Sequence, residues 1–273
     1  MPYGDKLPSL LLFVVLMDLL AGLLGPSRAM SRIPILCYHN IGRPPEPGPF
    51  SLLYVSAEKL ERQLWTLRRL GLRGVSISEG VRQLERGNRN DQVVLTFDDG
   101  YLDTLTQALP LLRQYGCTAT CYLVSDAVGR HNLWDVEVLH EKKPLMSQQQ
   151  IQQWLAAGME IGSHSCSHPR LQTLDASGRQ WEIAESRASL QRAFGVPVEH
   201  FCYPYGTFTA AIAEEVQRAG YRSAVSLAPG PAHSGNPLHC LPRMLVNGDH
   251  GWLRFLVKVG APYEYLVSWR WRA

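Results

Sequence analysis

Residues 93–100 have the sequence VVLTFDDG, in which an apolar run ends in two adjacent aspartates, Asp98 and Asp99. The run 93–97 is short and rich in β-branched residues, which is typical of a buried strand. Side chains that leave a strand one after the other point in different directions, so the two carboxylates are expected to meet different partners. One can bind a metal ion while the other faces water. The alternative is an Asp-Asp-Gly turn that caps the next helix.

Similar β-rich runs alternate with helical patterns along the chain, which indicates an α/β fold with parallel strands. The helices have leucines at helical spacing, and Ser56 and Ser147 are expected to be N-caps. The number of strands favours a closed or partly open barrel over an open sheet, with functional residues directly after strand C-termini and with segments 42–50 and 229–237 as loops bordering that face. The candidate strands are 33–37, 74–77, 93–97, 118–124, 159–162, 200–203, 222–227 and 241–246.

A second polar segment, HSCSHP at residues 164–169, also follows an apolar candidate strand. His164 and His168 are four residues apart and reach one ion if the loop makes a helical turn. Imidazole and carboxylate together suit zinc and its neighbours, and three protein ligands leave one position open for water. The alternative is a pair of packed or surface histidines.

A third segment, FCYPYG at residues 201–206, again follows a candidate strand. Gly206 permits a close backbone approach, so the turn is expected to form a groove wall whose backbone N–H faces a developing oxyanion. The alternative is an aromatic turn that only closes the barrel.

The composition limits the function classes. The chain has 273 residues, 45% hydrophobic and 19% charged, which suits one globular barrel domain. The net charge is +3 and the basic residues are spread out, so no nucleic-acid partner is expected. The six cysteines form no CxxC pair. Four of them, Cys37, Cys117, Cys121 and Cys202, lie in or directly beside candidate strands, so reduced core cysteines are expected instead of disulfides.

Residues 1–30 differ from the rest of the chain. Lys6 precedes an apolar run at 10–24, which resembles a secretory signal or short anchor, although Asp18 interrupts it. The leader predicts membrane association through the N-terminus and an extracytoplasmic location. If translation starts at Met30, the leader is an artefactual extension and the location is cytoplasmic. Residues 31–273 are expected to form the catalytic domain.

The three segments, in this order and each after a strand, resemble the motifs of the polysaccharide deacetylase family. This is the NodB-homology domain, also called carbohydrate esterase family 4. The resemblance covers residues 33–246 and includes Tyr38 and His39 after the opening strand. It implies a distorted (β/α) barrel with about seven parallel strands.

The resemblance also implies roles for individual residues. Asp99, His164 and His168 would bind a divalent metal, in the first place zinc, with cobalt or nickel as alternatives. Asp98 would be the catalytic base, and the backbone amide of Tyr205 would help to hold the oxyanion.

Two departures from the family pattern affect these roles. Many members carry an arginine at the position of Cys202 that orients the catalytic aspartate, and Arg243 is the candidate substitute here. No segment matches the one that supplies the general-acid histidine in many members, and His250 is assigned to that role. The alternatives are His39, His233, His239, a metal-ligand histidine and Asp98 itself.

The segment FCYPYG, followed by LPR at 241–243, is similar to the branch of the family that acts on poly-N-acetylglucosamine and related polymers. Substrate contacts are expected from Tyr38, His39, Tyr203 and Pro204. The chain is therefore expected to remove N-acetyl groups from an amino-sugar polysaccharide, oligosaccharide or lipid-linked glycan, releasing acetate and a free amine. The alternatives are an O-acetyl esterase or other amidase on the same fold, a non-catalytic carbohydrate-binding protein, and a glycosyltransferase, which would leave the two histidines unexplained. The sequence does not specify the oligomeric state.

Overall fold

The structure is a computed structural model that describes residues 32–44, 49–87, 91–136 and 142–260. The expected leader at residues 1–30 lies outside these ranges. Within them, no helix combines the length and the apolar character needed to cross a bilayer.

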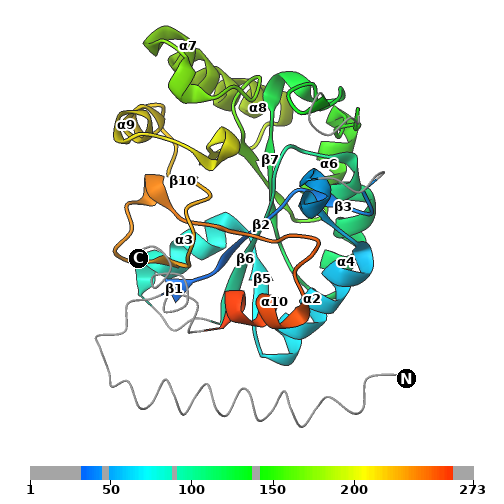
Figure 1. Ribbon diagram of the computed structural model, residues 1–273. Helices are drawn as coiled ribbons and strands as arrows, with labels where there is room; N and C mark the ends of the chain where they lie inside the picture. Colours follow the sequence, from blue (N-terminus) through cyan, green and yellow to red (C-terminus); the bar gives the residue numbers. More distant parts are fainter. Residues whose placement is uncertain (1–31, 45–48, 88–90, 137–141, 261–273) are drawn as a thin grey trace.

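A sheet of parallel strands forms the centre of the molecule, with helices packed around it (Figure 1). The strand order is β10-β9-β8-β7-β6-β2-β12, and β5 pairs with the first half of β6. A parallel bridge between Val225 and Leu241 connects the two ends of this order, so the sheet curls into a distorted barrel. The predicted fold class is confirmed, and every candidate strand is present: β2 (Ile35–Tyr38), β5 (Arg73–Val75), β6 (Gln92–Phe97), β7 (Thr120–Leu123), β8 (Glu160–Ser163), β9 (His200–Cys202), β10 (Ser223–Val225) and β12 (Met244–Leu245).

The helices connect the strands, and two of them begin at the N-caps that the sequence predicted. The Ser56 hydroxyl accepts a hydrogen bond from the Lys59 N–H, and Ser147 forms a capping box with Gln150. The helices are α2 (Ala57–Arg69), α3 (Ile77–Arg86), α4 (Leu109–Gln114), α6 (Gln148–Ala156), α7 (Ala176–Gln180), α8 (Ser186–Phe194), α9 (Ala210–Arg218) and α10 (Trp252–Val259), with π-helical turns η3 (Thr104–Ala108) and η6 (Trp181–Glu185) and 3-10 turns η2 (Pro49–Leu53), η4 (Ser125–Ala127), η5 (Leu171–Thr173), η7 (Pro204–Gly206) and η8 (Leu238–Cys240).

Both faces of the sheet are buried, and the side chains of each strand alternate between them. Val94 belongs to the inner core cluster, whereas its neighbour Leu95 packs in the outer cluster with the helices. Because the side-chain period of a strand is two residues, the row that contains Val94 continues through Thr96 to Asp98. The pleat of β6 thus places the first aspartate of the pair in the barrel interior.

Two expectations about the strands and loops were wrong. Pro34 has no N–H to donate to a sheet, and the run 33–37 is split there into β1 (Arg32–Ile33) and β2. β1 pairs antiparallel with β11 (Ala232–His233). Because β1 precedes β2, the segment 229–237 lies at the amino end of the strands and not at the site face. A separate parallel pair is formed by β3 (Asn40–Ile41) and β4 (Tyr54–Val55).

Candidate active site

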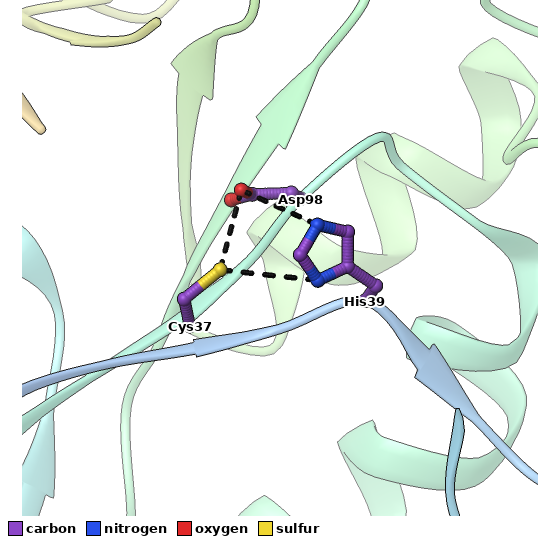
Figure 2. A group of neighbouring side chains, drawn as sticks. All are labelled: Cys37, His39 and Asp98. Carbon is purple, nitrogen blue, oxygen red and sulfur yellow. Dashed lines mark hydrogen bonds and ion pairs between the residues drawn. The ribbon is translucent and has the colours of Figure 1, made fainter. Parts of the chain in front are cut away.

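Asp98 lies at the carboxyl end of β6, beside two residues at the end of the neighbouring strand β2. The register pairs Tyr38 with Phe97, so Cys37, on the inner side of β2, and His39, the residue directly after β2, come next to Asp98. The Cys37 Sγ is 3.4 Å from Asp98 Oδ2, and His39 Nε2 is 4.0 Å from the same oxygen (Figure 2). The Asp98 side chain is 2% exposed, so the carboxylate is nearly desolvated.

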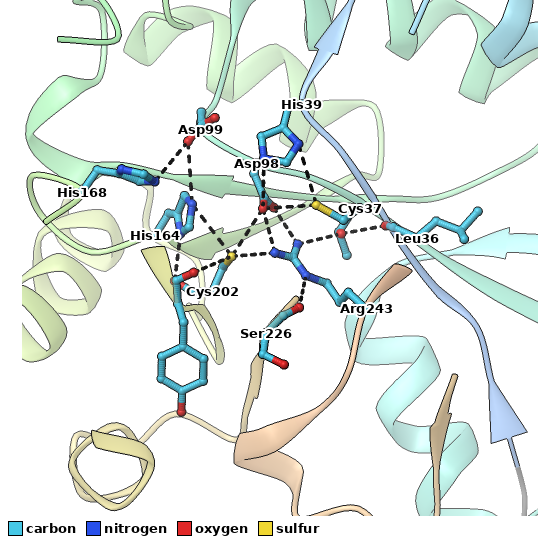
Figure 3. A network of polar contacts seen from close by, with 12 residues as sticks. Leu36, Cys37, His39, Asp98, Asp99, His164, His168, Cys202, Ser226 and Arg243 are labelled. Atoms are coloured by element: carbon cyan, nitrogen blue, oxygen red, sulfur yellow. Dashed lines mark hydrogen bonds and ion pairs between the residues drawn. The ribbon is translucent and has the colours of Figure 1, made fainter. Parts of the chain in front are cut away.

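Arg243 crosses the barrel interior to Asp98, as the sequence predicted (Figure 3). Its Nη1 and Nη2 donate to Oδ1 and Oδ2 of Asp98, each at 2.7 Å. The guanidinium also donates to the Thr96 hydroxyl at 3.0 Å and to the Ser226 carbonyl at 3.1 Å. A bidentate pair with additional anchors fixes the plane of the carboxylate. Cys202 also lies here, with its Sγ 3.0 Å from Arg243 Nη2.

The ion pair determines the protonation state of Asp98. Burial alone would raise the pKa of this carboxyl, but the guanidinium of Arg243 more than offsets the burial and holds the pKa below the ordinary value of an aspartate. Asp98 is therefore ionised at neutral pH and can accept a proton.

Asp99 points to a different set of partners, because its left-handed backbone (φ 71°) turns the chain at the strand end. The Asp99 Oδ1 is 3.7 Å from His164 Nε2 and 3.6 Å from His168 Nε2. This buried oxygen has no hydrogen-bond partner in the described part of the chain. Two donors that are each about 2.1 Å from one ion lie at most about 4.2 Å apart, so the three atoms fit a single divalent cation.

The orientation and the protonation state of the two histidines suit them to bind a metal ion. The Nδ1 of His164 hydrogen-bonds the Cys202 carbonyl oxygen at 2.8 Å, which leaves Nε2 with its lone pair facing Asp99. Burial lowers the pKa of His164 to about 4, and it lowers the pKa of His168 well below the usual value, with a further contribution from His164. Both imidazoles are therefore neutral at physiological pH, the form that binds metals.

The loop between the histidines is held by Glu182 of η6, a residue that the sequence did not reveal. Its Oε2 accepts hydrogen bonds from the N–H groups of Cys166 and Ser167 at 2.8 and 2.9 Å, and Oε1 accepts one from the Ser167 hydroxyl at 2.5 Å. Ser165 and His168 adopt positive φ values of 66° and 62°, so the loop needs such support. A lone glutamate on a helix gives no sequence signal for this contact.

Aromatic rings cover the outer side of the metal-ligand group. The Trp134 ring stacks on His168 with a centroid distance of 4.9 Å, and the Tyr205 ring lies edge-on to His168 at 4.6 Å. Tyr205 has a left-handed backbone (φ 59°), and no acceptor among the described residues pairs with its N–H. A Cβ on the next residue, Gly206, would collide with the backbone and side chain of Leu227, so this turn requires a glycine.

Several predicted site residues lie elsewhere. Tyr38 and Tyr203 are 0% exposed, and their hydroxyls donate to Gln63 and to the His239 carbonyl, so the expectation that they contact substrate was wrong. Pro204 is also buried. Tyr38 and Tyr203 pack in the outer core cluster, between the sheet and the helices.

His250 lies in the turn before α10. Its Nδ1 accepts a hydrogen bond from the Asn247 N–H at 3.2 Å, and its Nε2 is 3.9 Å from Asp249. Within the described ranges, no contact joins His250 to Asp98 or Asp99.

The family model for polysaccharide deacetylase matches residues 85–224, which contain Asp98, Asp99, His164 and His168. The Bacillus subtilis protein YxkH, named as a polysaccharide deacetylase, is 26% identical over 220 residues, covering 80% of this chain and 72% of that protein. The chitooligosaccharide deacetylase of Azorhizobium caulinodans is 29% identical over 180 residues, 65% of this chain and 78% of the relative. The Escherichia coli poly-beta-1,6-N-acetyl-D-glucosamine N-deacetylase is 24% identical over 246 residues, 77% of this chain but only 36% of that longer protein.

Solved structures share the fold. The Streptococcus pyogenes deacetylase PplD in complex with acetate superimposes with a TM-score of 0.73 at 22% identity, over 85% of this chain and 100% of that one. IcaB from Ammonifex degensii gives a TM-score of 0.67 at 24% identity, over 85% and 98% of the two chains. The family match, the fold and the arrangement of the site agree: this chain belongs to the polysaccharide deacetylase family and is a hydrolase.

Proposed function

We propose that the chain is a metal-dependent N-deacetylase that acts on glycans containing N-acetylated amino sugars. The observation that carries the proposal is the unpartnered Asp99 Oδ1, which lies 3.7 and 3.6 Å from the Nε2 atoms of His164 and His168. It lies directly beside an ionised carboxylate that is fixed by Arg243. Two named relatives act on N-acetylglucosamine polymers or oligomers, which supports the same substrate class here.

Asp99, His164 and His168 would hold the metal, with zinc suited to this donor set and cobalt or nickel as alternatives. A bound divalent ion supplies Lewis acidity, which polarises a carbonyl and lowers the pKa of water. Asp98 takes the proton from the attacking water, because it is ionised and held in place by Arg243. The N–H of Tyr205 donates to the developing oxyanion.

Release of the amine requires a proton on the sugar nitrogen. Burial lowers the pKa of His39, so its imidazole starts neutral; it takes up the proton that Asp98 removed from water and passes it to the nitrogen. His39 is partly exposed, with 15% of its side chain accessible, and its Nε2 lies 4.0 Å from Asp98. His250, the donor expected from the sequence, contacts only its own turn among the described residues. We therefore assign the acid role to His39. Water and the N-acetyl group are thereby converted into acetate and a free amine.

The test is acetate release by the purified full chain, supplied with zinc or cobalt, from N-acetylglucosamine oligomers and from O-acetylated xylan. Asp98→Asn is expected to retain metal but to lose turnover by about 10²–10⁴-fold, whereas His164→Ala loses both metal and turnover. His233→Ala, in β11 at the opposite end of the strands, is the control. Near wild-type turnover of Asp98→Asn would overturn the base assignment, and release only from O-acetylated xylan would identify an esterase.

A further inference from the structure

Two cysteine thiols lie against Asp98 and have no part in the proposed reaction. The Sγ of Cys37 is 3.4 Å, and that of Cys202 3.5 Å, from the same oxygen, Asp98 Oδ2. Both cysteines are unpaired and 0% exposed. Soft sulfur donors therefore flank the carboxylate that acts as the base.

Cys37, His39 and Asp98 have the spacing of a second cation site, separate from the Asp99 group. One ligand atom from each lies within 4.8 Å of the others. The Sγ of Cys37 is 3.4 Å from Asp98 Oδ2 and 3.9 Å from Nδ1 of His39, while the other ring nitrogen, Nε2, is 4.0 Å from Asp98 Oδ2, so one of the two nitrogens would be the ligand (Figure 2). Donors around one tetrahedral zinc are separated by roughly 3.3–3.8 Å, so small side-chain movements complete the set. We propose that these three residues bind a thiophilic divalent cation and that its binding inhibits the enzyme.

Ligand chemistry separates this site from the one at Asp99. The group of Asp99, His164 and His168 offers nitrogen and oxygen, whereas the proposed site adds a thiolate. Thiolate ligands select soft ions, so cadmium, and zinc in excess, are the cations expected here, while cobalt or nickel prefers the Asp99 group.

The charges at the site also favour a thiolate-bound ion. Arg243 already balances the charge of Asp98, so a divalent cation needs negative charge from another group. Cys37 provides it by releasing its thiol proton to solvent as the metal–sulfur bond forms. The ion enters past His39, because the side chain of His39 is partly exposed whereas Cys37 and Asp98 are buried.

Inhibition follows from the shared carboxylate. An Asp98 that is bound to a cation cannot accept the proton of the attacking water. This consequence rests on the proposed role of Asp98 as the base, whereas binding of the cation itself does not.

The experiment titrates cadmium into the full chain loaded with one equivalent of cobalt, and follows both the ultraviolet charge-transfer absorption of a cadmium thiolate and acetate release. One further equivalent of metal is expected to produce the thiolate band, with parallel loss of activity and without release of cobalt. Cys37→Ser is expected to abolish the thiolate band. Loss of even an outer-shell partner of a metal lowers the affinity by about 10–100-fold, so loss of the ligand Cys37 should raise the inhibitory cadmium concentration by at least that factor. Each inhibition constant is compared with the uninhibited rate of the same variant.

Cys240→Ser is the matched control, because Cys240 is a partly exposed free thiol outside the site. A second variant, Cys37→Ala, is measured in case the serine hydroxyl disturbs the core. A band that survives both Cys37 variants but disappears in Cys240→Ser would overturn the proposal, as would stoichiometric release of cobalt. If the chain releases no acetate from any substrate, the absorption titration still decides whether the site exists.

Discussion

Arg243 donates to both carboxylate oxygens of Asp98 at 2.7 Å, although the two residues are 145 positions apart in the sequence. Both side chains are nearly inaccessible, at 0% and 2% exposed. A buried ion pair of this geometry adds little stability compared with two well-packed apolar side chains, but removal of one partner leaves an uncompensated charge. The pair therefore fixes the position and the ionisation of the base.

Arg243→Lys is expected to lower kcat and to move the acidic limb of the kcat/KM profile to higher pH. The guanidinium holds the pKa of Asp98 below its usual value against the effect of burial, and a single ammonium cannot bond both oxygens. The pKa of Asp98 should rise, so the base becomes ionised only at higher pH. An unshifted acidic limb would contradict this account.

Arg243→Met tests the same pair through stability. The depressed pKa of Asp98 means that the pair stabilises the fold at neutral pH and loses its effect only in strong acid, as the carboxylate is protonated. Without the arginine, the buried carboxylate is unpaired, and the free energy of unfolding at pH 7 should fall by about 3–5 kcal/mol. Urea unfolding at several pH values measures this loss, which should shrink where Asp98 is neutral.

His39→Gln should reduce turnover on N-acetyl substrates by about 10²–10⁴-fold, the range typical for loss of a general acid or base. His250→Gln should change turnover little, because His250 contacts its own turn. Steady-state kinetics with N-acetylglucosamine oligomers compare the two, with metal content measured in parallel. The opposite ranking would return the acid role to His250.

Glu182→Ala should weaken metal binding by about 10–100-fold, the usual effect of losing an outer-shell contact. Its carboxylate holds Cys166 and Ser167 between the two histidine ligands, so its loss frees the loop. Equilibrium dialysis with zinc gives the affinity. The control is Glu185→Ala in the same turn, which removes only a surface ion pair with Arg192. Equal zinc affinities in the two variants would show that the hydrogen bonds of Glu182 to the loop do not contribute to metal binding.

Gly206→Ala should destabilise the protein more than Gly195→Ala. Both glycines have left-handed backbones, with φ of 68° and 67°, which costs an alanine about 1–2 kcal/mol. A Cβ at Gly195 meets nothing within 4 Å, whereas one at Gly206 meets the Leu227 side chain. Overpacking should add about 1–3 kcal/mol at Gly206, and kcat should fall because Tyr205 moves. Denaturant unfolding measures the loss of stability in each variant. Equal losses in the two variants would show that the contact with Leu227 adds no steric cost.

The sequence by itself determined the family, the strands and the core of the site. Asp98, Asp99, His164 and His168 follow strands within short local motifs, and the carboxyl ends of parallel strands meet at one end of a barrel. Local periodicity and turn chemistry carry that information, so the motifs were recognisable without a structure.

Only the tertiary structure decided which groups surround these residues. The pleat and register of β2 and β6 place Cys37 and His39 beside Asp98, and they turn Tyr38 away from the site into the core. The hydrogen bonds from the loop between His164 and His168 to Glu182 depend on how η6 packs against that loop. Such contacts join distant parts of the chain through packing, which leaves no periodic pattern in the sequence.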